Sequence, residues 1–278
     1  MWQRTRYAYI PAPAAFSSFS GLIHTGKKKY ILSIVPEGTH VQAVYLTPET
    51  GICSIDLKDR ICIDCSTIDR ATSLAIKQHI AETNHPSASF YDAPVSGGAV
   101  GAEKGTIAFF LGCAGGDPNI ARLTAFLRLM GKHVIPCGGP SLGLAAKLCN
   151  NYLSGVIALA SSEALNMGIR AGLDPRVLSD VFAAGTAQNA ICDKFNPCPG
   201  VVGEAPSSKG YEGGFKVQLM KKDFALAVDL ARSVEAKLVL GEKGLETYEA
   251  ASEDSRCRDR DSRVVFRFIG GDEEWARK

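Results

Sequence analysis

Apolar residues along the first half of the chain form two alternating kinds of segment. Short apolar runs that end at Pro, Gly or polar residues predict buried strands at 31–36, 60–67, 89–98, 105–113 and 132–138. Helical spacing predicts helices at 39–46, 69–83 and 117–131. In the last of these, Asp117 is the expected N-cap and Pro118 the first helical residue. The alternation indicates an α/β layer with a largely parallel sheet.

The second half of the chain shows helical spacing only. One long helix is predicted over 143–171, with Gly172 as the glycine that ends it, and Asp174 and Pro175 begin the next helix. A third helix is predicted over 214–233, and its apolar stripe consists of Val217, Met220, Phe224 and Val228. Further helices are expected near 241–252 and 261–269. We therefore predict an α/β domain at 31–139 and an all-α domain at 140–278, with residues 1–30 unassigned.

Composition and charge narrow the choice of partners. The chain is 46% hydrophobic and 22% charged, as in ordinary globular proteins, and its net charge is +2. This balance gives no reason to expect nucleic acid or an anionic membrane as the partner. No uninterrupted apolar run reaches the ~20 residues of a membrane span, so a membrane is not expected either.

The nine cysteines are scattered along the chain. Cys62 and Cys65 form a C-x-x-C pair, but it lies within a predicted strand, and no second pair or histidine partner stands at the spacing of a zinc finger. Buried, reduced thiols are therefore favoured over a zinc or redox pair. We expect no metal site and a reducing compartment.

Residues 1–30 contain no Asp or Glu but several Arg, Lys and Ser residues. This composition is typical of an organelle transit segment, which favours a mitochondrial protein over a cytoplasmic one. The alternative is a disordered or misassigned amino end.

Two polar residues share one face of the long apolar helix. Lys147 and Asn151 stand four residues apart, so their side chains project together. A lysine here is either a surface residue whose stem lies along apolar neighbours or a functional amine.

Two other short segments carry candidate chemistry. Ser96, Gly97 and Gly98 follow a predicted strand, where backbone N–H groups without side chains can bind an anion such as a carboxylate. The alternative is an ordinary turn. The group Lys221, Lys222 and Asp223 stands near the start of an amphipathic helix.

Several segments in one order carry a resemblance to a known family. They are YDAPVSGGAVGAEKGTIAFFLGC, GLAAKLCNNYL, EALNMGIRAGLDP, NPCPGV, GYEGGFKVQLMKKDFALA and VVFRFIGGDEEW. Together they resemble the β-hydroxyacid dehydrogenases from about residue 31 to residue 275. The resemblance implies an NAD-binding Rossmann-like domain, here incomplete, followed by an all-α domain of the 6-phosphogluconate dehydrogenase-like type.

The resemblance also implies a role for individual residues. Lys147 matches the catalytic lysine and Asn151 the substrate-site asparagine on the next turn. The segment Ser96, Gly97, Gly98 matches the loop that holds the substrate carboxylate. The residues that match cofactor contacts are Val35, Pro36, Thr67 and Lys222.

The activity implied by the resemblance is NAD-dependent oxidation of a short hydroxy acid. The NPCPGV and GYEGGF segments favour 3-hydroxyisobutyrate, which would be oxidised to methylmalonate semialdehyde in valine breakdown. The alternatives are a glyoxylate or succinic-semialdehyde reductase, or a non-catalytic interaction protein that has lost cofactor binding. A homo-oligomer formed through the helical domain is also expected.

The chain departs from the family pattern at its amino end. The 278 residues contain no G-x-G-x-x-G turn, which in Rossmann folds holds the cofactor pyrophosphate at a helix N-terminus. At least one βαβ unit of ~30 residues is missing, through biology or through the gene model. We therefore expect no NAD-dependent turnover from the chain as it stands. Ser141 replaces a glycine at the helix entry, and His40 replaces a polar amide.

Overall fold

A computed structural model describes residues 29–277. Its strands all lie in the first half of the chain: β1 (Tyr30–Ser33), β2 (Ile61–Asp64), β3 (Ser89–Asp92), β4 (Val95–Ser96), β5 (Ile107–Leu111) and β6 (Gly131–Pro136). The helices of this half are α2 (Gly38–Leu46), α3 (Arg70–Thr83), α4 (Gly98–Glu103) and α5 (Ile120–Leu127). The second half holds α6 (Leu142–Arg170), α7 (Pro175–Ala184), α8 (Ala190–Phe195), α9 (Val217–Ser233), α10 (Gly241–Glu253) and α11 (Val265–Phe268).

The strands of the first domain form a largely parallel layer, as the sequence predicts. Strands β1, β2 and β3 pair in parallel in that order, and β5 pairs in parallel with β6, while β4 runs antiparallel to β5. Gly112 N donates to Asp92 O, which joins the two groups of strands at the ends of β3 and β5.

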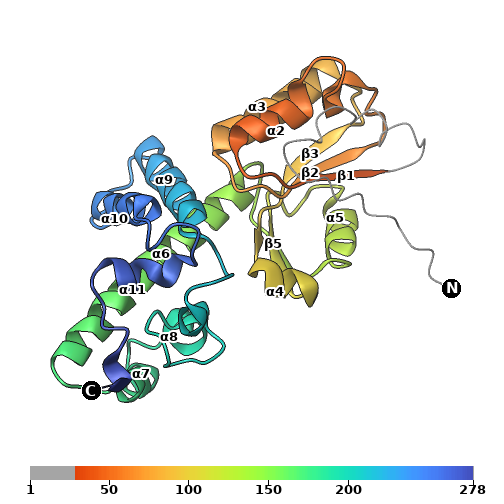
Figure 1. Cartoon of the computed structure of the whole chain (residues 1–278). Coiled ribbons are helices and arrows are strands. Elements are labelled where there is room, and N and C mark those ends of the chain that lie inside the picture. The colour runs from red at the N-terminus through yellow and green to blue at the C-terminus, as the bar shows by residue number, and fades with distance from the viewer. Residues whose placement is uncertain (1–28, 278) are drawn as a thin grey trace.

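Helices cover both faces of this layer because the side chains of β2 alternate in direction. Cys62 packs on one face among residues of α2 and α3, whereas Ile61 and Ile63 pack on the other face with Leu123 and Leu127 of α5. In Figure 1, α2 and α3 lie on one side of the strands and α5 on the opposite side. The first domain therefore has the doubly wound arrangement of a Rossmann-like fold.

Local geometry corrects two predictions. The strand predicted at 89–98 is divided into β3 and β4, because Pro94 cannot donate a ladder hydrogen bond. Asp117 is not the N-cap of α5, which begins after Asn119. The Asp117 carboxylate instead accepts hydrogen bonds from the Asn119 N–H and the Tyr91 hydroxyl.

The second domain is built around α6, which crosses it from end to end in Figure 1. Helices α9, α10 and α11 pack on α6 and on one another around a core that contains the whole predicted stripe of α9. Gly172 adopts a left-handed φ of 95°, and the Asp174 side chain caps α7 by accepting from Arg176 N, as predicted. Helix α8 was not expected from the sequence.

Length and composition alone would allow α6, which has 29 residues and contains an 18-residue window of mean hydropathy 1.2, to cross a membrane. A core helix of a globular protein passes the same test. Lys147 and Asn151 are buried on this helix, and its residues Tyr152, Val156 and Leu159 pack against the core formed by α9 and α10.

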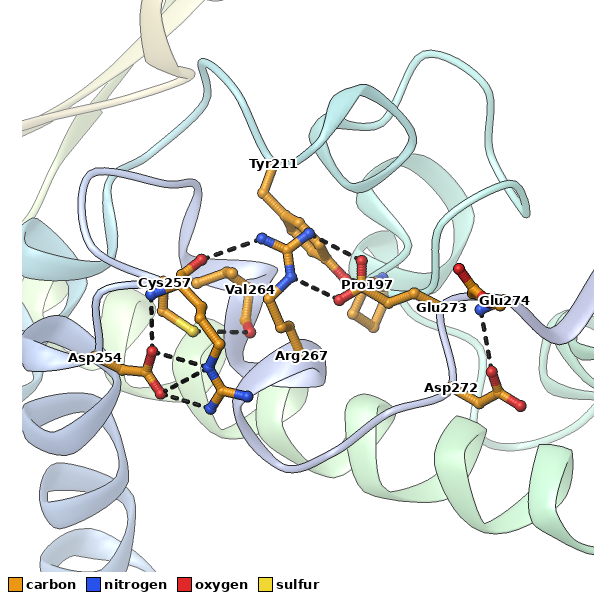
Figure 2. Close-up of polar contacts among 10 residues, drawn as sticks. Pro197, Tyr211, Asp254, Cys257, Val264, Arg267, Asp272, Glu273 and Glu274 are labelled. Carbon is orange, nitrogen blue, oxygen red and sulfur yellow. Dashed lines mark hydrogen bonds and ion pairs between the residues drawn. The ribbon is translucent and has the colours of Figure 1, made fainter.

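Arg267 is one of the residues that hold the carboxyl-terminal segment on the second domain. Arg267 of α11 forms a two-point ion pair with Glu273, at 2.6 and 2.9 Å, and stacks over the Tyr211 ring at 4.9 Å (Figure 2). The buried Tyr211 hydroxyl donates to Pro197 O at 2.8 Å. These contacts connect the loop before α9 to the end of the described chain.

All nine cysteines are free. Cys62 and Cys65 are buried, and burial raises the pKa of the Cys62 thiol to about 12 and that of Cys65 well above its usual range. The burial that the sequence favours for Cys62 and Cys65 is therefore confirmed. The transit-segment prediction rests on residues 1–30, of which residues 1–28 lie outside the described residues.

Candidate active site between the two domains

Lys222 of α9 connects the helical domain to the α/β domain. Its Nζ donates to the backbone oxygens of Pro36 and Thr67, at 2.9 and 2.6 Å. It also lies 3.1 Å from Asp223 Oδ1. Pro36 and Thr67 follow β1 and β2, so the carboxyl ends of two neighbouring parallel strands meet one lysine. This arrangement brings together three of the residues that the resemblance implies for the cofactor, and Val35 adjoins Pro36.

Lys147 and Asn151 are buried one turn apart on α6, with 8% and 6% of their surface exposed. Asn151 Nδ2 donates to Asp223 Oδ2 at 2.5 Å. Lys147 has no hydrogen bond or ion pair within residues 29–277. Asp223 therefore contacts one predicted substrate residue and one predicted cofactor residue at the same time.

The charges of this cluster act on Lys147. Burial lowers the pKa of the Lys147 ammonium, and the positive charge of Lys222 lowers it further, while the Asp223 carboxylate opposes both effects. A lysine with a lowered pKa can give and accept a proton closer to neutral pH than a surface lysine can.

The first turn of α6 is fixed on the α/β domain by a buried carboxylate. Asp92, at the end of β3, accepts hydrogen bonds from Ser141 N and Leu144 N at 2.7 and 2.9 Å. Burial raises the pKa of Asp92, and these backbone N–H groups oppose the rise. Gly143 lies between them, and a Cβ there would overlap Phe110 O. Because Lys147 stands one turn further on, this contact sets its position.

Close packing of α6 on α9 brings Asn151 to Asp223. Gly155, one turn after Asn151, faces Phe224, and a Cβ at this position would stand 2.9 Å from the Phe224 ring. The Tyr248 hydroxyl donates to Gly155 O at 2.9 Å. A residue without a side chain is therefore needed for the two helices to approach this closely.

The turn at Ser96, Gly97 and Gly98 is not connected by polar contacts to the cluster around Lys147 and Asp223. Gly97 and Gly98 are exposed and have φ of 138° and 62°, a region that favours glycine. A Cβ on Gly98 would meet nothing within 4 Å. No hydrogen bond or ion pair joins this turn to Lys147 or Asn151 in the described part of the chain.

The sequence singles out Asp223 only as part of the group Lys221, Lys222 and Asp223, and it assigns the carboxylate no role in the site. The signal was available, because position 223 interrupts the buried face of α9 with a carboxylate next to Phe224. Asp64 and Ser66, which lie behind Val35, were missed as well. Each reads in the sequence as part of a strand and its exit.

Comparison with known proteins gives a consistent answer for both domains. Residues 9–139 match the family model described as the NAD binding domain of 6-phosphogluconate dehydrogenase. Residues 142–269 match the model described as NAD-binding of NADP-dependent 3-hydroxyisobutyrate dehydrogenase. The boundary between the two matches is the start of α6.

Curated relatives match along most of the chain. A Dictyostelium discoideum protein named "Probable 3-hydroxyisobutyrate dehydrogenase, mitochondrial" is 39% identical over 86% of this chain and 72% of its own length. The chain belongs to the 3-hydroxyisobutyrate dehydrogenase family. An NAD-dependent L-serine dehydrogenase of Pseudomonas aeruginosa is 34% identical over 78% of the chain and 71% of its own length.

A solved member of the family has the same fold. The Mycobacterium tuberculosis 3-hydroxyisobutyrate dehydrogenase with L-serine superposes with a TM-score of 0.78 at 28% identity, over 87% of this chain and 79% of that one. The Rossmann-like domain followed by a 6-phosphogluconate dehydrogenase-like helical domain is thus the fold of this chain. The family is one of oxidoreductases that use a nicotinamide dinucleotide.

Proposed function

We propose that this chain carries the substrate side of an NAD-dependent oxidation of 3-hydroxyisobutyrate to methylmalonate semialdehyde, a step of valine breakdown. The observation that supports this most directly is the cluster of Lys147, Asn151, Asp223 and Lys222 between the two domains. It combines a buried amine of lowered pKa with a second amine that reaches the ends of the parallel strands.

Lys147 acts on the hydroxyl group that is oxidised. Its neutral amine, which the lowered pKa makes accessible, takes up the hydroxyl proton, and the ammonium formed in this way stabilises the negative charge that develops on the substrate oxygen in the transition state. Asn151, held by Asp223, orients the substrate hydroxyl without adding a charge. When NAD is bound, its nicotinamide accepts the hydride.

The substrate carboxylate is assigned to the turn at Ser96, Gly97 and Gly98. Consecutive N–H groups in left-handed conformations form a concave donor surface for anions, and the space beside Gly98 is open. The glycines are therefore required for conformation and for access.

The nicotinamide side of the cofactor fits the residues that lie together here. Lys222 offers a partly buried ammonium beside Pro36 and Thr67, and the Val35 backbone completes the edge of the sheet. The pyrophosphate side is different, because the 278 residues contain no G-x-G-x-x-G turn. We infer that these residues hold the nicotinamide portion but bind NAD weakly by themselves.

L-serine is the second candidate substrate. It is favoured because one relative is named an L-serine dehydrogenase and the superposed structure is that of an enzyme with L-serine. L-serine and 3-hydroxyisobutyrate share a carboxylate and a primary hydroxyl group two carbons from it, so the same residues could serve both. Glyoxylate and succinic semialdehyde are the remaining alternatives.

We infer a mitochondrial location and a homo-oligomer formed through the helical domain. Support for the first comes from the acid-free composition of residues 1–30 and from the mitochondrial relative. Support for the second comes from the exposed apolar residues Leu173, Val177 and Val181 around α7. A fluorescent fusion and sedimentation velocity test these two points.

A substrate panel tests the reaction. We define the extended chain as residues 29–278 preceded by a strand–G-x-G-x-x-G–helix unit, and we expect it to oxidise 3-hydroxyisobutyrate with NAD at a higher kcat/KM than L-serine. The 278-residue chain itself should show no measurable turnover. A preference for glyoxylate with NADPH would reverse the substrate assignment, and rapid turnover by the 278-residue chain would contradict the weak NAD binding.

A further inference from the structure

A buried carboxylate lies behind the candidate cofactor residues without a role in the chemistry described so far. Asp64 ends β2 and is 1% exposed. Its Oδ1 accepts from the hydroxyls of Ser33 and Ser66 at 2.7 and 2.8 Å, while its buried Oδ2 has no partner among the described residues. A half-paired buried carboxylate is unfavourable for stability. Its presence therefore calls for another explanation.

The two hydroxyl groups lead in different directions. The Ser33 hydroxyl also contacts the Tyr45 hydroxyl at 2.9 Å, inside the core formed by α2. The Ser66 oxygen accepts the Val35 N–H at 2.9 Å. A serine hydroxyl has a single proton, so when Ser66 donates it to Asp64 a lone pair is left for Val35. The Asp64 carboxylate thus fixes the direction of the Ser66 hydroxyl.

The residues held in this way are the neighbours of those that Lys222 contacts. Pro36 follows Val35, and Thr67 follows Ser66, and Lys222 Nζ donates to the backbone oxygens of both Pro36 and Thr67. We call this pair of contacts the Lys222 bridge. The hydrogen bond from Val35 to Ser66 sets the distance between the two segments, since it connects them directly ahead of the two oxygens.

We propose that Asp64 is a positioning residue for the Lys222 bridge: through Ser66 it holds the segments after β1 and β2 at the spacing that Lys222 spans between the domains. The bridge itself is a property of the free chain. Only its consequence for NAD binding rests on the proposed function.

The test uses the 278-residue chain without cofactor and compares Ser66→Ala and Asp64→Ala with Ser33→Ala. The control, Ser33→Ala, removes the other hydroxyl bound to Asp64. It leaves intact the hydrogen bonds that connect Asp64 through Ser66 to Val35. The readouts are amide hydrogen exchange at Val35 and acylation of Lys222 by an amine reagent, with Lys77 as internal reference. Circular dichroism verifies that each variant is folded.

Ser66→Ala should raise both rates about five- to tenfold, as expected for the loss of one hydrogen bond. Asp64→Ala should do the same, and the double variant should add nothing further, because both residues act through one route. Ser66→Thr, which keeps the hydroxyl, should restore both rates. Ser33→Ala should leave them within about twofold of the wild type.

The proposal is overturned if Ser66→Ala responds like Ser33→Ala, or if the effects of Asp64→Ala and Ser66→Ala add. A second experiment, calorimetric titration of NAD into the extended chain, tests the proposed function separately. If NAD does not bind there while Val35 and Lys222 respond as expected, the proposed function fails and the positioning role stands. If NAD binds and the two rates do not respond, the positioning role fails alone.

Discussion

At the residue scale, the burial of Lys147 acts against the stability of the folded chain. Burial disfavours its ammonium and lowers its pKa, so the unfolded chain binds this proton more tightly than the folded chain. Stability contributed by this group therefore rises with pH between the lowered pKa and 10.5.

Lys147→Met should consequently stabilise the chain by about 1 kcal/mol at neutral pH, because it removes a buried charge and keeps the volume. The gap between variant and wild type should close as the pH approaches the ordinary lysine pKa. Denaturant unfolding at several pH values measures it. A destabilised variant at neutral pH would show that Lys147 is held by partners that outweigh its desolvation.

Asp64 gives a second prediction, of opposite sign. Burial raises its pKa from 3.8 to about 6, with a smaller contribution from Asp92, while Ser33 and Ser66 oppose the rise. The folded chain binds more protons than the unfolded chain in this interval, so stability from this group is present at low pH and is lost as the pH rises through about 6.

Asp64→Asn removes this titration. A shift of about two pKa units corresponds to ~3 kcal/mol, so the free energy of unfolding of the variant should gain 2–3 kcal/mol relative to wild type, as an order-of-magnitude figure, between about pH 4 and about pH 7. A difference that is independent of pH would contradict the raised pKa.

At this scale the sequence predicts the residues that stand in recurring motifs and misses those that support them. Lys147 and Asn151 are visible through their four-residue spacing, and Lys222 through the resemblance. The contacts of Asp223 and Asp64 could not be predicted, because they depend on segments that approach one another only after α9 docks against the ends of β1 and β2.

At the scale of elements, the packing of α6 on α9 decides where Asn151 and Asp223 lie. Gly155→Ala would place a Cβ 2.9 Å from the Phe224 ring and 3.3 Å from Met220 Sδ. We expect a loss of 1–3 kcal/mol of stability, as is typical of overpacking. Gly203→Ala, where a Cβ meets nothing within 4 Å, is the matched control. Equal unfolding free energies for the two variants would show that the helices are not closely packed.

A helix can be predicted from the sequence where its hydrophobic periodicity continues over several turns. All four residues of the predicted stripe of α9 are buried, and the bounds of α3 and α6 lie within one residue of those expected. Short elements cannot be predicted in this way. α8 has six residues, fewer than two helical turns, and Pro94 divides a run that reads as one strand. The start of α5 was misplaced because Asp117 binds Tyr91, a contact distant in sequence.

At the scale of the whole molecule, one edge of β1 is unpaired within residues 29–277. Strand β1 pairs with β2 on one side, and no described strand pairs with the other side. Leu32 and Ile34 are 38% and 60% exposed there. An apolar edge strand with free N–H and C=O groups favours association.

The 278-residue chain should therefore associate at rising concentration, and Ile34→Lys should reduce the associated fraction several-fold by placing a charge at the edge. Val239→Lys is the control, since Val239 is 86% exposed but lies away from the sheet, between α9 and α10. Sedimentation velocity measures both. If the two variants associate equally, the edge of β1 is not the surface that drives association.

The assignment of Lys147 as the catalytic amine is the central claim, and one kinetic measurement tests it most directly. In the extended chain, Lys147→Ala should lower kcat for 3-hydroxyisobutyrate by ~10²–10³ and leave KM nearly unchanged, because the ammonium acts on charge that develops only in the transition state. A variant with the wild-type kcat, or one in which only KM changes, would contradict the account.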